Sequence, residues 1–284
     1  MPSFFIAFQY LAPQHLLSRL VGLFAKSRLF KKPFIGWFKN RYKVDLSEAL
    51  IEDPYAYENF NAFFTRELKP DARPISKELA AVVSPADGAI SQVGDIQDDL
   101  LLQAKGKQFS ISSLLACDQE TAAKFAGGRF VTVYLSPRDY HRVHMPLAGK
   151  LKKMTYVPGK LFSVNQQTAE SVDNLFAVNE RLVCYFDTEI GPVAVVLVGA
   201  MIVAGIETVW PGPGAPNKSN VSITTENYSD IDLERGEEMG RFNLGSTAIV
   251  LFPKDTVQFD SELQAGSTIR MGEKIATQIQ RTQT

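Results

Sequence analysis

The strongest candidate for chemistry is a serine that directly precedes an apolar run of strand length. Ser246 follows Gly245 and opens the run that ends at Phe252, where Pro253 closes it. A serine in that place is held rigidly, and the preceding glycine lets the peptide take a strained geometry and be approached closely. The arrangement suits a hydroxyl that attacks its own upstream carbonyl. The alternative is an ordinary turn at a strand entry, which we expect where the tripeptide recurs at 266–268.

Two of the three histidines, His141 and His144, lie together in the segment 136–146. A strand-like run precedes this segment, so we expect a loop at the end of a strand. Histidine titrates near neutral pH and is the default proton carrier. Two alternatives are surface histidines in a loop, and a metal site that also uses Asp139. No fourth ligand has the spacing of a metal motif, which disfavours the metal site.

Asp87 lies in an Asp-Gly pair, which is a preferred hairpin turn. The functional alternative is a carboxylate that orients a histidine, as in a Ser-His-Asp arrangement. The nucleophile elbow of α/β-hydrolases is absent, because Ser246 is followed by Thr247 and Ala248. An ordinary esterase is therefore disfavoured.

The elements that must position these groups change in character along the chain. Helical patterns precede residue 75, including a helix expected over 53–68 with Asp53 as its N-cap. From Val82 onward, short apolar runs alternate with turn residues. This pattern predicts an α+β fold, with N-terminal helices followed by a mostly antiparallel β barrel or sandwich. We expect an N-terminal membrane-association region at 1–75 and a β-rich catalytic domain at 76–284.

The basic residues are concentrated at the N-terminus. The net charge is −1, yet residues 1–44 carry +8 and no acid, so the remaining 240 residues carry −9. Leu16, Leu20 and Phe24 share one helical face. No apolar run approaches the roughly 20 residues that span a bilayer, and no signal-peptide cleavage site is present. The pattern favours a segment that lies in an anionic membrane interface.

Several other classes are open or disfavoured at this stage. A core helix with solvated lysines and an organellar transit peptide are alternatives for the N-terminus. Nucleic-acid binding is disfavoured, because no RNA- or DNA-binding motif accompanies the charge. The two cysteines, Cys117 and Cys184, form neither a disulfide framework nor a zinc motif.

Five stretches, in order, resemble phosphatidylserine decarboxylases, which are pyruvoyl-dependent membrane enzymes. They are Phe63–Leu68 with Arg73–Ile75; Ser84–Gly88; Leu135–His144; Pro158–Asn165 with Leu175–Phe176 and Asn179–Arg181; and Gly236–Thr247. The resemblance implies cleavage between Gly245 and Ser246 into a beta chain, 1–245, and an alpha chain, 246–284. Ser246 then becomes the covalent pyruvoyl group.

The resemblance also implies roles for the site residues. Asp87, His144 and Ser246 would form the self-cleavage triad, and His141 would serve decarboxylation and its protonation step. His144, oriented by Asp87, would take the Ser246 proton; the alkoxide would attack Gly245, and β-elimination would free the upstream chain. The candidate substrate contacts are Asp139, Tyr140, Phe162, Val164 and Asn165.

The implied reaction converts phosphatidylserine to phosphatidylethanolamine and CO2 through a Schiff base to the pyruvoyl group, without a metal. The implied setting is peripheral, on the cytoplasmic face of the bacterial cell membrane, where the enzyme meets phosphatidylserine in an anionic membrane. The implied assembly is a homodimer of alpha–beta heterodimers. A Ser-His-Asp hydrolase and a non-enzymatic membrane-binding β-sandwich module are the alternatives, and both predict an uncut chain.

Overall fold

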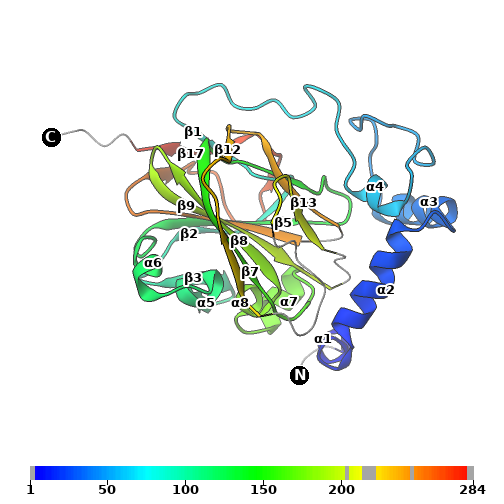
Figure 1. Ribbon diagram of the computed structural model, residues 1–284, viewed down its shortest axis with the longest axis horizontal. Helices are drawn as coiled ribbons and strands as arrows, with labels where there is room; N and C mark the ends of the chain where they lie inside the picture. The colour runs from blue at the N-terminus through cyan, green and yellow to red at the C-terminus, as the bar shows by residue number, and fades with distance from the viewer. Residues whose placement is uncertain (1–3, 202–204, 213–221, 244–245, 280–284) are drawn as a thin grey trace.

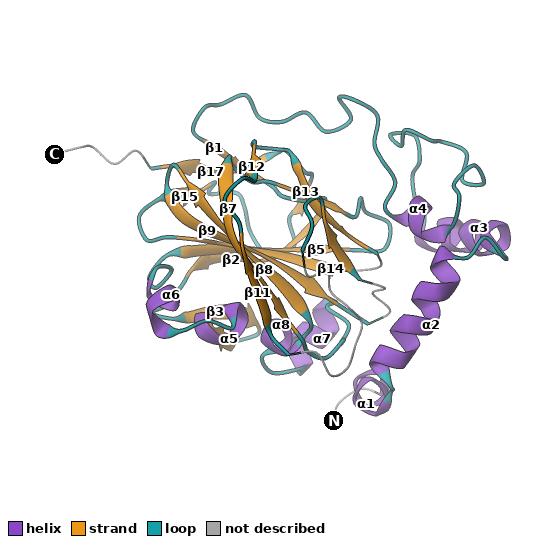
Figure 2. Cartoon of the chain, viewed as in Figure 1, coloured by secondary structure: helices purple, strands orange, loops and turns teal. Residues whose placement is uncertain are grey.

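The computed structural model describes residues 4–201, 205–212, 222–243 and 246–279, with N-terminal helices beside a body of antiparallel sheets (Figure 1). The helices are α1 (Phe4–Leu11), α2 (Gln14–Lys26), α3 (Lys31–Tyr42), α4 (Phe60–Phe64), α5 (Ile111–Leu115), α6 (Gln119–Ala123), α7 (Gln166–Ser171) and α8 (Leu175–Val178). Helices α1 to α4 stand to one side, and a long loop leads from α4 over the top of the sheets to the first strand (Figure 2).

One large antiparallel sheet forms the centre of the body. Its order is β11 (Thr224–Asn227), β7 (Gly149–Val157), β8 (Arg181–Thr188), β9 (Gly191–Gly199), β14 (Ser246–Phe252), β5 (Arg129–Leu135), β2 (Gly88–Asp95) and β16 (Thr268–Ile269), and β12 (Asp232–Leu233) also pairs with β7. Strand β14 lies in the middle, paired with β5 on one side and β9 on the other.

Three smaller antiparallel sheets surround the large one. They are β10 (Ile206–Thr208), β13 (Glu238–Phe242) and β6 (Arg142–His144); β1 (Ala81–Val83), β17 (Lys274–Gln278) and β15 (Val257–Phe259); and β3 (Leu100–Ala104) with β4 (Lys107–Ser110). The expected α+β class with antiparallel sheets is confirmed.

The large sheet is buried on both faces. Along β14, Ala248 and Val250 belong to a core shared with the β6 and β17 sheets, whereas Ile249 and Leu251 face a second core that includes residues of α5 to α8. A strand covered on both faces reads as a continuous apolar run. The smaller sheets cover the inner face. Of the two expected forms, barrel or sandwich, the closed barrel is wrong. The edge strands of the large sheet, β11 and β16, do not pair with each other in the described structure.

The expected helix over 53–68 is wrong at both ends: α4 spans only Phe60–Phe64, and Leu68 forms an isolated β-bridge with Ala49. Residues 54–58 form turns, and α4 begins only after Asn59, whose side chain accepts a hydrogen bond from the Ala62 amide at 2.9 Å. The Lys31 ammonium binds the carbonyls of Tyr55 and Tyr57, which takes these groups out of a helical ladder. The Asn59 cap and these side-chain contacts thus outweigh the N-cap expected at Asp53.

The N-terminal helices have a small aromatic core of their own. Ile35 and Phe38 of α3 pack with Phe60, Phe63 and Phe64 of α4, and all five side chains are buried. The helices therefore hold α4, and the residues that follow it, as one unit beside the sheets.

We predict that Ile35→Ala loosens this unit selectively. Removing a fully buried Ile side chain should lower the local free energy of unfolding by about 2–5 kcal/mol. Hydrogen exchange should accelerate at α3 and α4 but not at β14, because the two regions have separate cores. Lys32→Ala, an exposed site in the same helix, is the control. Equal acceleration in β14 would contradict a separate N-terminal core.

Candidate active site

Ser246 is the first residue of the central strand β14. It pairs with Leu135 of β5 and Gly199 of β9, and its side chain is fully buried. Its Oγ has no hydrogen-bond partner among the described residues. The expected cleavage partner Gly245, together with Leu244, lies outside the described residues. A buried hydroxyl without a partner is uncommon and asks for an explanation.

The histidine segment follows β5 directly, at the same end of the sheet as Ser246. The Asp139 carboxylate accepts hydrogen bonds from the Ser136 amide and hydroxyl, both at 2.7 Å, which closes the loop on itself. The buried Arg66 side chain donates to the carbonyls of Arg138 and Asp139 at 3.0 and 3.4 Å. The candidate substrate residue Asp139 thus has a structural task in this loop.

His141 is fully buried beneath α4. Its Nδ1 lies 2.9 Å from the Asp139 carbonyl, and its ring centroid lies 3.9 Å from that of Phe64. A carbonyl can only accept, so Nδ1 carries the hydrogen and Nε2 presents a lone pair, which has no partner among the described residues. Burial lowers the pKa of His141 to about 3, so the ring is neutral at pH 7.

His144, in β6, is held from both sides. Its Nδ1 donates to the Gly236 carbonyl at 2.8 Å, and the Tyr140 hydroxyl donates to its Nε2 at 3.0 Å. Burial lowers the pKa of His144, and the bond to Gly236 opposes that shift only in part. His144 therefore has the tautomer that a general base needs, with Tyr140 occupying the basic nitrogen.

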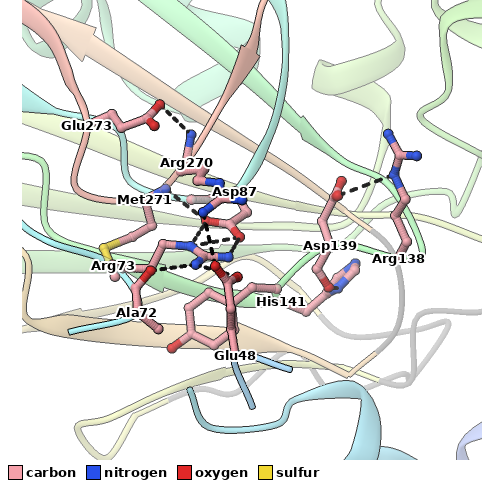
Figure 3. A network of polar contacts seen from close by, with 12 residues as sticks. Glu48, Ala72, Arg73, Asp87, Arg138, Asp139, His141, Arg270, Met271 and Glu273 are labelled. Atoms are coloured by element: carbon pink, nitrogen blue, oxygen red, sulfur yellow. Dashed lines mark hydrogen bonds and ion pairs between the residues drawn. The ribbon is translucent and has the colours of Figure 1, made fainter. Parts of the chain in front are cut away.

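Asp87 lies where the chain passes from β1 to β2, and these two strands belong to different sheets rather than to a hairpin. Its carboxylate binds the Arg73 guanidinium, with Nε–Oδ1 at 2.8 Å, and accepts from the Met271 amide at 2.8 Å. Arg73 also binds Glu48 at 2.8 Å. Figure 3 shows this network on one side and Asp139 with His141 on the other.

The structure brings Asp87 and His144 of the proposed triad near each other, but no hydrogen bond among the described residues joins the three members. In the described structure, Asp87 is bonded to Arg73 and Met271, and the Gly236 carbonyl takes the expected place of Asp87 at His144 Nδ1. The Asp87 charge still acts on His144 through space and raises its pKa, against the larger effect of burial.

The remaining candidate substrate residues lie elsewhere. Phe162 and Val164 pack in the core under α5 to α8, on the opposite face of the sheet from Ala248. The Asn165 side chain caps α7 by accepting from the Thr168 amide at 2.9 Å. Of the five candidates, Tyr140 alone contacts a proposed catalytic histidine through its side chain.

Sequence reasoning missed the side chains that support the site. Arg142 donates to the Thr65 carbonyl at 3.0 Å and binds Glu238 at 2.8 Å, which ties β6 to the end of α4. Asn61 donates to the Asn243 side chain at 3.0 Å, just before the undescribed cleavage segment. Arg142, Glu238 and Asn243 lie in stretches that carry the resemblance, but the resemblance names no partner for them, and Asn61 lies outside those stretches.

The described residues contain no group of three His, Cys, Asp or Glu side chains placed to hold a metal ion. Asp139 uses its carboxylate within its loop, and both His141 and His144 have Nδ1 on a backbone carbonyl. This part of the chain therefore offers hydroxyl and imidazole groups for acid–base and nucleophilic chemistry.

We predict that acid destabilises the fold partly through His141. An unfolded histidine binds a proton below about pH 6.5, whereas folded His141 stays neutral down to about pH 3. The unfolded state then binds more protons, so the free energy of unfolding falls as the pH falls through this window. The free energy of unfolding can be measured with urea at pH 7, 6 and 5. Its change with pH should be less steep in His141→Gln than in the unaltered chain, by up to about 1.4 kcal/mol per pH unit. Identical slopes would refute this; His15→Gln is the control.

Comparison with known proteins identifies the chain. Residues 60–277 match the phosphatidylserine decarboxylase family, and residues 4–43 match a second family description, PSD. A phosphatidylserine decarboxylase proenzyme of Ectopseudomonas mendocina is 60% identical over 95% of this chain and 96% of its own length. The phosphatidylserine decarboxylase proenzyme of Pseudomonas aeruginosa is 60% identical over 96% of this chain and 96% of its own length. The chain therefore belongs to the phosphatidylserine decarboxylase family and is a decarboxylase of that class.

Proposed function

We propose that this chain converts phosphatidylserine to phosphatidylethanolamine and CO2 with a pyruvoyl group made from Ser246 by cleavage after Gly245. The observation that carries the proposal is the Ser246 hydroxyl, which is fully buried at the start of the central strand and has no hydrogen-bond partner in the part of the chain that the structure describes. The comparisons favour this reaction over a Ser-His-Asp hydrolase or a non-enzymatic β-sandwich module.

The residues present fit a pyruvoyl group. Ser246 Oγ makes no hydrogen bond in the described structure. Conversion of Ser246 to a pyruvoyl group removes this oxygen, and no described residue would lose a hydrogen-bond partner as a result. The group supplies a ketone that takes the substrate amine and draws off the electron pair left by the departing carboxyl group. The surrounding residues bind the substrate and move protons.

His144 is the candidate base for the Ser246 hydroxyl. Its Nδ1 hydrogen is fixed on the Gly236 carbonyl, so Nε2 is the nitrogen that can take a proton. Tyr140 must give up its hydrogen bond to Nε2 before Ser246 can use that nitrogen. In this arrangement Asp87 contributes its negative charge, which stabilises protonated His144, and it also holds Arg73 and Met271 in place.

His141 is the candidate proton carrier for decarboxylation. Its ring is neutral at pH 7, and its Nε2, which has no partner among the described residues, is the atom that would accept a proton and return it to the α-carbon of the product.

Helix α2 supports peripheral membrane association. It buries its small and polar residues Gln14, Ser18, Gly22 and Ala25. It exposes Leu16, Leu20 and Leu23 to between 54% and 71%. An exposed leucine face beside basic residues fits an anionic membrane interface. None of the described helices is long and apolar enough to cross a bilayer.

The proposal includes the setting of the enzyme. Residues 1–75 would form the membrane-association region and 76–284 the catalytic domain. The cleaved chains, 1–245 and 246–284, would stay together and pair as a homodimer of heterodimers. The enzyme would act at the cytoplasmic face of the bacterial cell membrane, where the exposed leucines meet phosphatidylserine.

The cleavage site is tested by a matched pair of serines. Ser246→Ala should yield one uncut chain by denaturing intact mass spectrometry, because no hydroxyl attacks the preceding carbonyl. Ser267→Ala should be cut like the unaltered protein, since Ser267 sits in a turn where its Oγ accepts from the Gln264 amide. An uncut Ser267→Ala with a cut Ser246→Ala would reverse the assignment of the site.

The same assay separates the histidines. His144→Ala and Asp87→Ala should stay uncut. His141→Ala should be cut yet decarboxylate phosphatidylserine about 100-fold more slowly or worse, the size of a lost acid–base group. A fully active His141→Ala, or a cut His144→Ala, would remove that residue from its proposed role.

Membrane binding is tested at the exposed face of α2. Leu23→Glu should weaken binding to vesicles that contain phosphatidylglycerol by about tenfold or more, because a Leu contact is lost and a like charge is added. Leu79→Glu is the control, since Leu79 is 93% exposed and lies outside the helices. Equal effects of the two changes in vesicle co-sedimentation would argue against α2 as the membrane face.

A further inference from the structure

A second buried carboxyl group lies in line with Ser246 across the large sheet. Ser246 pairs with Gly199 of the neighbouring strand β9. The Gly199 amide in turn donates to the Glu180 carbonyl at 2.8 Å, which extends the β8–β9 ladder by one residue before Arg181. Glu180, Gly199 and Ser246 therefore form one row across three adjacent strands. Two strand spacings place the backbones of Glu180 and Ser246 about 10 Å apart.

The side chains of Glu180 and Ser246 project from the same face of the sheet. Residues two apart on a strand share a face, so Glu180 goes with Leu182 and Ser246 with Ala248. Leu182 and Ala248 both belong to the inner core between the large sheet and the smaller ones. The Tyr156 hydroxyl, from the same core, donates to Glu180 Oε2 at 3.1 Å and confirms the direction of the carboxyl group.

The residue between the two groups in this row is a glycine, so no side chain separates them there. A methyl group at Gly199 would meet the Glu180 carbonyl at 3.2 Å, Leu161 Cδ2 at 3.6 Å and Ile206 Cδ1 at 3.9 Å. Neither the Glu180 carboxyl group nor the Ser246 hydroxyl is among these nearest atoms. The position between the two functional groups thus carries no side chain, and its nearest atoms are one backbone carbonyl oxygen and two methyl carbons.

Glu180 has the environment of a functional acid rather than of a structural ion pair. Its side chain is 2% exposed, and none of the ion pairs in the described part of the chain includes it. Burial raises the pKa of Glu180 to about 7, against the smaller effect of the Tyr156 hydrogen bond. Near neutral pH the group is present in both its charged and its neutral form.

We propose that Glu180 receives the ammonium group of the serine head group and takes one proton from it. The ammonium becomes a neutral amine and the carboxylate becomes a carboxylic acid, so two opposite charges cancel inside the protein. The amine then has the lone pair that it needs to attack a carbonyl at residue 246. This assignment rests on the proposed function, in which residue 246 carries the reactive ketone.

The separation within the row favours the substrate over Ser246 as the partner of Glu180. A base for self-cleavage must reach the Ser246 hydroxyl directly, whereas two strand spacings separate the backbones of Glu180 and Ser246. An amine bound over Gly199 would lie between the two groups, with its nitrogen toward residue 246.

The test compares two nucleophiles on the same protein. Glu180→Gln keeps the shape and the acceptor for Tyr156 but cannot take a proton. The chain is treated with cyanoborohydride and short-chain phosphatidylserine, and the rate of covalent addition to the 246–284 fragment is read by mass. Hydroxylamine, which is uncharged at neutral pH, serves as the second nucleophile. We expect Glu180→Gln to be cut normally, to react normally with hydroxylamine and to add phosphatidylserine about 100-fold more slowly.

Other outcomes overturn the assignment. Unchanged addition of phosphatidylserine would show that Glu180 takes no proton, and an equal loss with hydroxylamine would show a structural role. An uncut Glu180→Gln with the melting temperature of the unaltered chain would place Glu180 in self-cleavage instead. An unaltered chain without the cut at residue 246 would refute the proposed function itself, and the inference with it.

Two further variants keep the test decisive if Glu180→Gln folds poorly. Tyr156→Phe keeps the carboxyl group but removes the hydrogen bond that favours its charged form, so it should slow phosphatidylserine addition and leave the hydroxylamine reaction unchanged. Asp187→Asn, an exposed carboxylate in the same strand β8, should change neither rate. A Tyr156→Phe chain that adds phosphatidylserine at the normal rate would contradict the proposal.

Discussion

The position of β14 between β5 and β9 is the constraint on which the candidate site depends. Pairing on both sides fixes the backbone of Ser246, and burial of both faces of the sheet keeps its hydroxyl away from solvent. The same pairing sets what surrounds it. Strand β5 leads directly into the histidine loop, and β9 brings Gly199 and the Glu180 row. One strand at the centre of the sheet thus determines which groups share its end.

Desolvation sets the protonation of these groups. The same burial that keeps His141 and His144 neutral raises the pKa of Glu180, because each charged form loses its hydration. The N-terminal unit creates part of this environment, since Phe64 covers His141 and Arg66 holds the loop carbonyls. The residues after α4 therefore link the N-terminal helices to the histidine loop, although the two regions have separate cores.

Sequence reasoning located the chemistry better than its geometry. The apolar run after Ser246 predicted the strand that the structure shows. The loop expected over 136–146 is confirmed at His141 but is wrong at His144, which lies in the short strand β6. The closed barrel was wrong because short runs of alternating residues do not reveal which sheet covers which face. The partner of His144 could not be foreseen either, because the Gly236 carbonyl that binds it leaves no mark in the residue pattern. A role for Glu180 could not be predicted for a related reason: its alignment with Ser246 depends on the register of three strands.

The most direct measurement is the intact mass of the unaltered protein under denaturing conditions, before and after treatment with hydrazine. The proposed conversion of Ser246 predicts two fragments, 1–245 and 246–284. The smaller one should be lighter than its unmodified sequence by the serine-to-pyruvoyl change and should gain one hydrazine. A single 31.5 kDa chain in folded protein that decarboxylates phosphatidylserine would contradict Ser246 as the source of the ketone.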